Sequence, residues 1–569
     1  MRFSRKFKDG RLVATLLPTG IHIRAVERLD EVASVVPLPV DLPASAVICF
    51  LWSPTSQRLL LATSDLVMVA AVDPPAGKEP FRAVIRNPTL PVTAKPTFVS
   101  LCPSDDCVCI CSAFGVKFVV FDLRTGQGVA IESPKFFSSA AVCSRGVSFR
   151  PATHHMALLV RTDGKDFVCL RDLVASAPVV TWELDTIDAQ GLVWSPDGRW
   201  LTVWESPAHG HKVLFYTPDG HLFKTWTGAA SGITARLPKL TSDSEARQDA
   251  SSSGTDAETS AADELFGSGV RLVQFSANAR HLAVGDASRT IRIIDMATVT
   301  TSMRLVHPTS IRPRVGSSLL TWQEQIDPVV ADTGHIFVEA THDVSPPGRP
   351  VASSIDSTTV SSGCTLMAFD SSSTLLATRI EEAPSTVWVW SLETAELCSV
   401  LMLHANVSTV VWQPTTPHTL LVTCEGDKHR GLGVVWNPLK DTPPQAANFA
   451  PYYPPSFNQG HSSLSGQPAG KYRPAWLDLK GIPPSLFYSD ANEFCLVALD
   501  EGDYHEYKAT DSIPWSEAEA PLATTFLGGK RWAIDDRVRE ESPLELVPAG
   551  VDIEGDSEVD DTFHYKKED

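Results

Sequence analysis

Residues 191–206 read GLVWSPDGRWLTVWES and hold the local pattern that decides the fold. Residues 195–198 have the composition of a β-turn, with serine first, proline fixing φ at the second position and glycine fourth. In the strand before this turn, Leu192 and Trp194 fall on one face and Val193 falls on the other. Because both faces are apolar, we expect two antiparallel strands within a sheet that is covered on both sides.

The same frame of apolar strand, turn and second apolar strand recurs along the chain. Further copies have turns beginning near residues 53, 102, 150, 276, 370 and 413, and degenerate copies lie at the start and near residue 490. Clear neighbours are about 43 to 49 residues apart, which is the length of a four-stranded propeller blade. One blade cannot bury both faces alone, whereas stacked blades can. We therefore expect an all-β, WD40-type β-propeller.

The number of blades is less tightly specified. Nine frames are visible, and the interval 300–364 contains two more strand-like segments, SLLTWQEQ and GHIFVEATHD, that suit a further blade. We expect about nine or more blade-like repeats, arranged either as one large ring or as two rings. The sequence does not choose between these arrangements.

Composition divides the chain into repeat regions and interruptions. Residues 240–264 are rich in Ser, Asp and Glu and contain no aromatic or β-branched aliphatic residue, so they cannot bury enough apolar area to offset the entropy of ordering. The predicted division is blades 1–5 in 1–239, a disordered acidic insertion in 240–268, further blades in 269–505 with a Pro-rich loop at 442–475, and an acidic, largely disordered tail in 506–569.

Charge and hydropathy exclude several classes of protein. With 48 Lys and Arg against 67 Asp and Glu, the formal net charge is −19, which disfavours direct binding of nucleic acid or of an anionic membrane. No run of about 18 uncharged apolar residues occurs, and the first residues lack the apolar core of a secretory signal. We expect a soluble, cytoplasmic protein.

Four of the eleven cysteines lie together in LCPSDDCVCICSAF, as Cys102, Cys107, Cys109 and Cys111. Alternate residues of a strand point to one face, so a metal site there is conceivable. The spacing has no Cys-x-x-Cys knuckle and no nearby histidine pair. We therefore expect buried thiols that act as small hydrophobic side chains.

The sequence gives no sign of catalysis. It contains no phosphate-binding loop, dinucleotide fingerprint, nucleophile elbow or zinc-protease helix motif. Its paired polar residues are expected at solvated turns between strands: His154-His155, Asp105-Asp106 and Glu381-Glu382. We expect no catalytic, cofactor-binding or metal-binding residues, and an enzyme with a site in the central channel of a propeller is the least favoured alternative.

Several phrases resemble the spindle-pole and centrosomal WD-repeat proteins of the WRAP (Wdr-type) family. The resemblance covers most of residues 1–505 and is strongest over 145–310 and 364–440. The phrases that carry it are RTDGKDFVCLRD from Arg161, Leu214-Phe215-Tyr216 before Pro218-Asp219-Gly220, Leu282-Ala283-Val284-Gly285, His307-Pro308, and Ala377-Thr378-Arg379 leading to Pro384 and Val387-Trp388-Val389-Trp390.

This resemblance implies a non-catalytic scaffold that binds proteins. Members of the family associate with a coiled-coil anchoring protein of the Msd type and, in fungi, with a minus-end-directed kinesin. They help to anchor microtubule minus ends at the spindle pole body or centrosome and to organise the mitotic spindle. No motif assigns the partner-binding residues. The alternative is a WD40 scaffold in another complex, such as a substrate receptor in ubiquitin transfer or a translation-associated factor.

Overall fold

The computed structural model places every described residue in one compact unit, Met1–Trp532. The described residues are 2–4, 11–26, 28, 31–39, 42, 46–64, 66–72, 81–86, 96–112, 115–135, 145–174, 177–228, 233–234, 269–312, 319–326, 335–348, 363–426, 429, 431–449, 474–477, 485–489, 494–498 and 530–532. The predicted disordered segment 240–264, most of the predicted Pro-rich loop and nearly all of the predicted tail lie outside them.

The described strands form nine sheets, and in every sheet the core strands pair antiparallel in chain order. The first five sheets each have four strands, which are β1 (Arg2–Ser4), β2 (Leu12–Leu17), β3 (Gly20–Ala25) and β4 (Ser34–Val36); β5 (Cys49–Trp52), β6 (Arg58–Ala62), β7 (Leu66–Ala71) and β8 (Arg82–Arg86); β9 (Phe98–Leu101), β10 (Cys107–Cys111), β11 (Lys117–Asp122) and β12 (Gly128–Glu132); β13 (Val147–Phe149), β14 (His155–Thr162), β15 (Lys165–Asp172) and β16 (Ala177–Glu183); and β17 (Ala189–Trp194), β18 (Leu201–Glu205), β19 (Val213–Tyr216) and β20 (Leu222–Trp226).

The remaining four sheets follow the same plan with additions. They comprise β21 (Ile233–Thr234) with β22 (Val270–Phe275), β23 (His281–Asp286), β24 (Thr290–Asp295) and β25 (Thr300–Val306); β26 (Leu320–Ile326) and β27 (His335–Glu339) with β28 (Cys364–Phe369), β29 (Leu375–Ile380), β30 (Thr386–Ser391) and β31 (Glu396–Met402); β32 (Val407–Trp412), β33 (Leu420–Cys424), β34 (Leu432–Trp436) and β35 (Gln445–Asn448); and β36 (Ala475–Leu477), β37 (Ser485–Ser489), β38 (Phe494–Ala498) and β39 (Lys530–Trp532).

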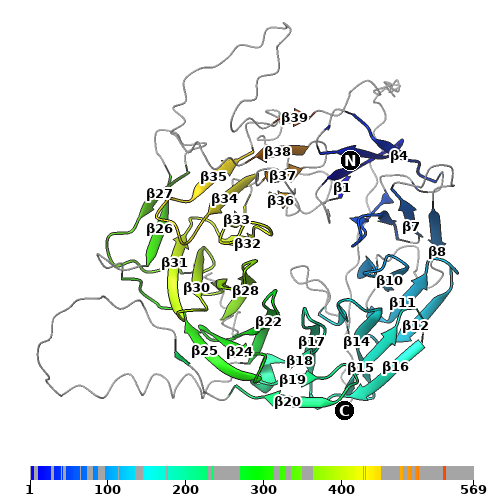
Figure 1. Ribbon diagram of the computed structural model, residues 1–569, viewed down its shortest axis with the longest axis horizontal. Helices are drawn as coiled ribbons and strands as arrows, with labels where there is room; N and C mark the ends of the chain where they lie inside the picture. The colour runs from blue at the N-terminus through cyan, green and yellow to red at the C-terminus, as the bar shows by residue number, and fades with distance from the viewer. Residues whose placement is uncertain are drawn as a thin grey trace, which may run out of the picture. The chain divides into compact units, whose positions relative to one another are not determined.

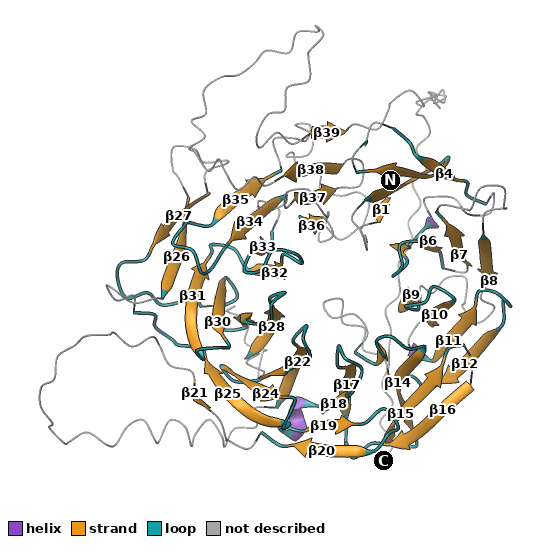
Figure 2. Cartoon of the chain, viewed as in Figure 1, coloured by secondary structure: helices purple, strands orange, loops and turns teal. Residues whose placement is uncertain are grey.

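Within this unit the sheets follow one another in chain order around a common axis, with β17, β22, β28 and β32 among the strands nearest that axis (Figure 1). Strands make up almost all of the described regular structure, and the segment between β18 and β19 contains a short 3₁₀ helix, Pro207–His209 (Figure 2). This is the β-propeller architecture that the repeated frame predicts. No helix in the described part of the chain is long and apolar enough to cross a membrane.

The turn at residues 195–198 forms as predicted. The Gly198 N–H donates to the Ser195 carbonyl at 2.8 Å, and Gly198 has φ of 68°, a left-handed conformation that glycine adopts without strain. The Ser195 hydroxyl accepts the Trp200 N–H at 3.0 Å, which joins the turn to the next strand. The same closing bond and a positive φ at the fourth residue recur in the turns that begin at Ser53, Cys102, Ser276 and Asp370.

Eight buried apolar clusters connect the nine sheets in an uninterrupted series. Leu192 and Trp194 pack toward the β13–β16 sheet, while Val193 packs toward the sheet of β22–β25. Both faces of the β17–β20 sheet are therefore covered, as the alternation of apolar residues predicts. Every other pair of successive sheets shares one such cluster as well. Two separate rings would interrupt this series, so its continuity favours one ring.

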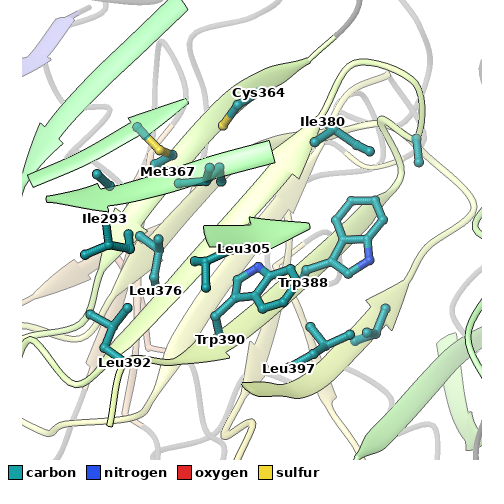
Figure 3. Close-up of a cluster of buried hydrophobic side chains, with 14 of the residues drawn as sticks. Ile293, Leu305, Cys364, Met367, Leu376, Ile380, Trp388, Trp390, Leu392 and Leu397 are labelled. Atoms are coloured by element: carbon teal, nitrogen blue, oxygen red, sulfur yellow. The ribbon is translucent and has the colours of Figure 1, made fainter. Parts of the chain in front are cut away.

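Figure 3 shows the cluster between the sheet of β22–β25 and the sheet of β28–β31. Trp388 and Trp390 of β30 lie with Leu305 of β25 and Ile293 of β24, and all four side chains are buried. Such contacts between sheets provide most of the apolar burial, because each blade is only one sheet thick.

The described residues of the interval 300–364 form no further blade of their own. Its strand-like segments become β26 and β27, a hairpin that extends the sheet of β28–β31 because β26 pairs parallel with β31. In the same way, β21 pairs parallel with β25. In both cases a segment that precedes a blade is added to that blade's outermost strand. A local sequence pattern indicates a strand but does not specify this distant partner.

Two other strands lie in segments that the sequence assigns to irregular structure. Strand β35 lies within 442–475 and pairs with β34, because the residues between Pro444 and Pro451 contain no proline to remove ladder hydrogen bonds. Strand β39 lies within 506–569 and pairs with β38. The last two sheets therefore take their outer strands from segments that we expected to be loop and tail.

Candidate functional site

The cysteine cluster belongs to the apolar core. Cys107, Cys109 and Cys111 on β10 point to the same face and pack with Met156 and other apolar residues of the neighbouring sheet. Burial raises the pKa of the Cys111 thiol to about 12, so this thiol stays neutral at physiological pH. The expectation that these thiols act as small hydrophobic side chains is confirmed.

Cys102 has a different role, because it occupies the first position of the recurring turn. Its Sγ accepts the Cys107 N–H at 3.1 Å, as the hydroxyl of Ser195 accepts an N–H in the repeat quoted above. Hydrogen bonds from Cys107 and Ser104 lower the pKa of the Cys102 thiol to about 6. The side chain is fully buried, so this sulfur stabilises the turn and has no contact with solvent.

One expectation about the paired carboxylates is wrong. Asp105 is buried and does not lie at a solvated turn. Its carboxylate accepts a hydrogen bond from Thr55, and its carbonyl accepts one from Arg58 Nη1 at 2.6 Å. Asp105 is thus a contact between the β5–β8 and β9–β12 sheets. Glu382 also has a structural partner, the Gly363 N–H at 3.1 Å. Among the described residues, no group of three or more His, Cys, Asp or Glu side chains is placed to hold a metal ion.

Charged and polar side chains gather where one sheet connects to the next. We define the upper face as the side that carries these connections and the turns between second and third strands, such as residues 162–165; the opposite side is the lower face. On the upper face, Lys135 Nζ lies 2.9 Å from Asp166 and 2.7 Å from Asp188. Arg161 is 3.3 Å from Asp166. This network joins three successive sheets.

The Asp166 carboxylate is fully buried and also accepts the Ala189 N–H at 2.7 Å. Glu205, at the end of β18, accepts the N–H groups of Ile187 and Asp188 at 2.8 and 2.7 Å. Burial would raise the pKa of Asp188, but hydrogen bonding to Lys135 and the charge of that lysine lower it below its usual value. Asp188 therefore remains ionised, and the hydrogen bonds of the three carboxylates hold the connection between β16 and β17 in one conformation.

A second network lies around Asp286, at the end of β23. Its buried carboxylate contacts Arg292 at 2.6 Å, His211 at 3.1 Å and the Ser288 hydroxyl at 2.6 Å. Burial alone would raise the pKa of Asp286, but the bonds from His211 and Ser288 and the charge of Arg292 lower it. Since His211 precedes β19, this network ties the β17–β20 sheet to the next one.

A third network is centred on His307, between the sheets of β22–β25 and β28–β31. The Nδ1–H donates to the Arg289 carbonyl at 2.8 Å, and Nε2 accepts the Thr378 hydroxyl at 2.8 Å. Thr378 also accepts the Trp390 indole N–H at 3.0 Å. Burial lowers the pKa of His307 to about 4, which keeps the ring neutral. In the sequence, His307 stands out only through the phrase His307-Pro308, one of those that carry the resemblance to the WRAP proteins.

These three networks engage two buried carboxylates, Asp166 and Asp286, and the neutral ring of His307 in contacts between sheets. Each acid or histidine at their centres has partners within the protein, and its geometry serves to fix the connections on the upper face. The arrangement suits a rigid scaffold that presents loops to other proteins. Sequence reasoning did not identify Asp166, Glu205 or Asp286, because an isolated acidic residue at a strand end looks like an ordinary solvated turn residue.

The chain has recognisable relatives among curated proteins. It is 22% identical over 348 residues to the mouse protein "WD repeat-containing protein WRAP73", across 57% of this chain and 63% of that protein. It is 26% identical over 167 residues to "Uncharacterized WD repeat-containing protein C32H8.09" of Schizosaccharomyces pombe, across 28% of this chain and 32% of that protein. The chain thus spans less than two thirds of either relative.

Two solved structures share its general form at low similarity. They are a dihydro-heme d1 dehydrogenase NirN in complex with DHE, with a TM-score of 0.41, 13% identity and coverage of 78% of this chain and 75% of that one, and a eukaryotic initiation factor, with a TM-score of 0.43, 10% identity and coverage of 79% and 88%. Neither similarity carries an argument about function. No family model matches the chain.

The repeated frame, the stacked antiparallel sheets and the two curated relatives agree with one another. The phrases that resemble the WRAP proteins lie on strands and turns of the propeller, as Val387 to Trp390 do on β30. From these observations, the chain is a WD-repeat β-propeller protein that is similar to the WD-repeat protein WRAP73.

Proposed function

We propose that the chain is a non-catalytic scaffold at the spindle pole body or centrosome, where it helps to anchor microtubule minus ends. In this role it binds a coiled-coil anchoring protein of the Msd type and, through that assembly, a minus-end-directed kinesin. It acts from the cytoplasm through protein–protein contacts, without a cofactor and without direct contact to nucleic acid or membrane.

The observation that carries this proposal is the similarity to the mouse WRAP73 protein over 57% of the chain. The geometry supports it, since the buried groups Asp166, Asp286 and His307 are engaged in holding sheet to sheet. A stiff ring of sheets with fixed loops offers several surfaces to partners at a low cost in conformational entropy.

Imaging of the full chain with a fluorescent tag in dividing cells tests this proposal. We expect the signal to concentrate at the spindle poles together with a pole marker, and the tag alone to stay diffuse. Depletion of the protein should disorganise the poles, and re-expression of the untagged chain should restore them. A mitotic signal that stays diffuse at a normal level of folded protein would contradict the proposal.

Purification of the tagged chain distinguishes the proposed role from other scaffold roles. The expected co-purifying protein is the coiled-coil anchoring protein, identified by mass spectrometry. Recovery of cullin or ribosomal subunits in its place would favour a substrate receptor or a translation-associated factor and would overturn the proposed function.

A further inference from the structure

The two most exposed large apolar side chains among the described residues are Ile187 and Val116, 64% and 57% exposed. Val116 lies in the turn between β10 and β11, and Ile187 lies in the connection between β16 and β17. By strand direction both belong to the upper face. Exposed aliphatic residues that gather on one face of a rigid domain are typical of protein-binding surfaces.

Hydrogen bonds connect the two positions through neighbouring loops. The Ser133 N–H donates to the Val116 carbonyl at 3.2 Å, and the Arg161 N–H donates to the Ser133 carbonyl at 3.0 Å. Arg161 Nη2 then donates to the Ile187 carbonyl at 3.4 Å. The two apolar side chains therefore lie on one continuous band of loops that crosses from the β9–β12 sheet to the β13–β16 sheet.

The backbone around Ile187 is held by buried charges. Its N–H donates to Glu205 and its carbonyl accepts from Arg161, while the next two N–H groups donate to Glu205 and Asp166. The side chain thus projects into solvent from a loop with a fixed conformation. A partner that binds it loses little loop entropy, which is the property expected of an interface anchor.

The hydrogen bonds to the backbone of Ile187 also indicate the secondary structure of the partner. Since the N–H and the carbonyl of Ile187 are already engaged, an extended strand gains no free backbone donor at this residue for pairing. A projecting aliphatic side chain fits instead into the hole formed by four side chains on the surface of a helix. The geometry therefore favours a helical partner over an extended peptide.

The charges beside Ile187 indicate which charge the partner's side chains should carry. Asp185 is 77% exposed while its partner Lys212 is 26% exposed, and Asp188 is 37% exposed while its partner Lys135 is 11% exposed. The lysines thus lie beneath the carboxylates, and since Arg161 pairs with Asp188 at 3.4 Å and is 39% exposed, Asp185 is the most exposed charge beside Ile187. An incoming segment meets an aliphatic side chain flanked by acidic groups, so lysine or arginine on the partner is favoured.

We propose that Ile187 and its flanking acids, Asp185 and Asp188, form the docking site for a helix of the partner protein that presents an apolar stripe bordered by basic residues, with Val116 at the edge of the contact. The inference rests on the proposed scaffold function, because it gives that function a surface. It adds the location of the surface and the chemistry of the helix that binds there.

Photo-crosslinking of the full chain in dividing cells tests the site directly. One version carries p-benzoylphenylalanine at position 187, and a control carries it at position 174. Val174 is also a β-branched aliphatic residue and is 50% exposed. It lies on the lower face, in the turn between β15 and β16. Mass spectrometry of the adducts identifies both the protein and the peptide that is crosslinked.

Position 187 is expected to crosslink to a basic helical segment of the coiled-coil anchoring protein, and position 174 is not. Crosslinking of position 187 to a basic helical segment of a different protein would support the docking site but overturn the proposed function. Adducts at 187 that are no stronger than at 174, or that lie in acidic or non-helical segments, would overturn the docking site even where the anchoring protein co-purifies.

Affinity measurements with the purified full chain and the purified anchoring protein give a second readout. Ile187→Asp should weaken binding by about tenfold or more, since it removes the apolar anchor and places a charge against the apolar stripe of the helix, whereas Val174→Asp should change it less than about twofold. Both variants should keep the melting temperature of the natural chain, because both side chains are exposed. Equal affinities of the two folded variants would contradict the inference.

Discussion

Trp194 shows how a single side chain links the repeat to the core. It is 4% exposed and packs between two sheets with Leu192 and Leu201, and the Arg150 guanidinium lies 5.5 Å from its ring centre. Trp194→Ala removes this buried ring and leaves a cavity. We expect the free energy of unfolding to fall by about 3–5 kcal/mol, as measured by urea denaturation.

Phe223 provides the matched control for this prediction. It is also aromatic and lies in the same sheet, but it is 56% exposed and contacts mainly the ring of Trp200. Phe223→Ala should cost less than about 1 kcal/mol. If both substitutions had the same small effect, Trp194 would not be a core residue.

His307 makes stability depend on pH. Its pKa is about 4 in the folded protein and 6.5 in the unfolded chain, so between these values the unfolded state binds a proton that the folded state does not. Its contribution to stability is therefore complete above pH 6.5 and decreases as the pH falls toward 4, by about 3 kcal/mol in all. Urea denaturation at several pH values between 7 and 4.5 measures this slope.

His307→Gln should lower stability at pH 7 and flatten the slope across this range. The control is His221→Gln, because the His221 side chain is 84% exposed. That substitution should leave the slope unchanged. An unaltered slope in the His307 variant would show that another group causes the acid sensitivity.

At the scale of elements, Asp166 fixes the connection between the β13–β16 and β17–β20 sheets. Its carboxylate is fully buried beside Lys135, whose side chain is 11% exposed. Asp166→Asn leaves the lysine charge without its buried partner, so we expect a loss of about 3–5 kcal/mol in the free energy of unfolding. Asp185→Asn breaks the exposed pair with Lys212 and should cost less than about 1 kcal/mol. Similar losses in the two variants would contradict this account.

The recurring turns explain how much of the fold could be predicted from the sequence. Proline, glycine and serine at fixed places in 195–198 specify a turn locally, and the alternation around Trp194 specifies which faces are buried. The pairing of β26 with β31 is not local, since the two strands are far apart in the chain. The segments that form β26 and β27 were recognisable as strands, but the sheet that they join was not predictable.

The same difference separates the buried thiols from the polar networks. Cys107, Cys109 and Cys111 were predictable because strand alternation puts them on one face. Asp166 and Asp105 were not, because burial of an acid depends on partners such as Lys135 and Thr55 that approach from other sheets. The interaction surface at Ile187 likewise depends on bonds from Glu205, which no local pattern reveals.

At the scale of the whole molecule, the core is a series of contacts between successive sheets. The segment 240–264 has no aromatic or β-branched aliphatic residues, so we expect it to contribute nothing to that core. Removing it should shift the melting temperature by no more than about 2 °C, because loop-closure entropy changes slowly with length. Differential scanning calorimetry of the deleted and full chains measures this shift, and a large decrease would mean that the segment contributes to stability.

The parallel strands β21 and β26 have a consequence for how this protein tolerates change. Each pairs a segment that connects two blades with an outer strand. Residues inserted into such a connection are therefore held far from the innermost strands. Such connections can gain or lose residues over evolutionary time while the stacked interior stays intact. They also cover backbone groups that would otherwise invite pairing with other chains, so variation at the rim carries less risk of self-association.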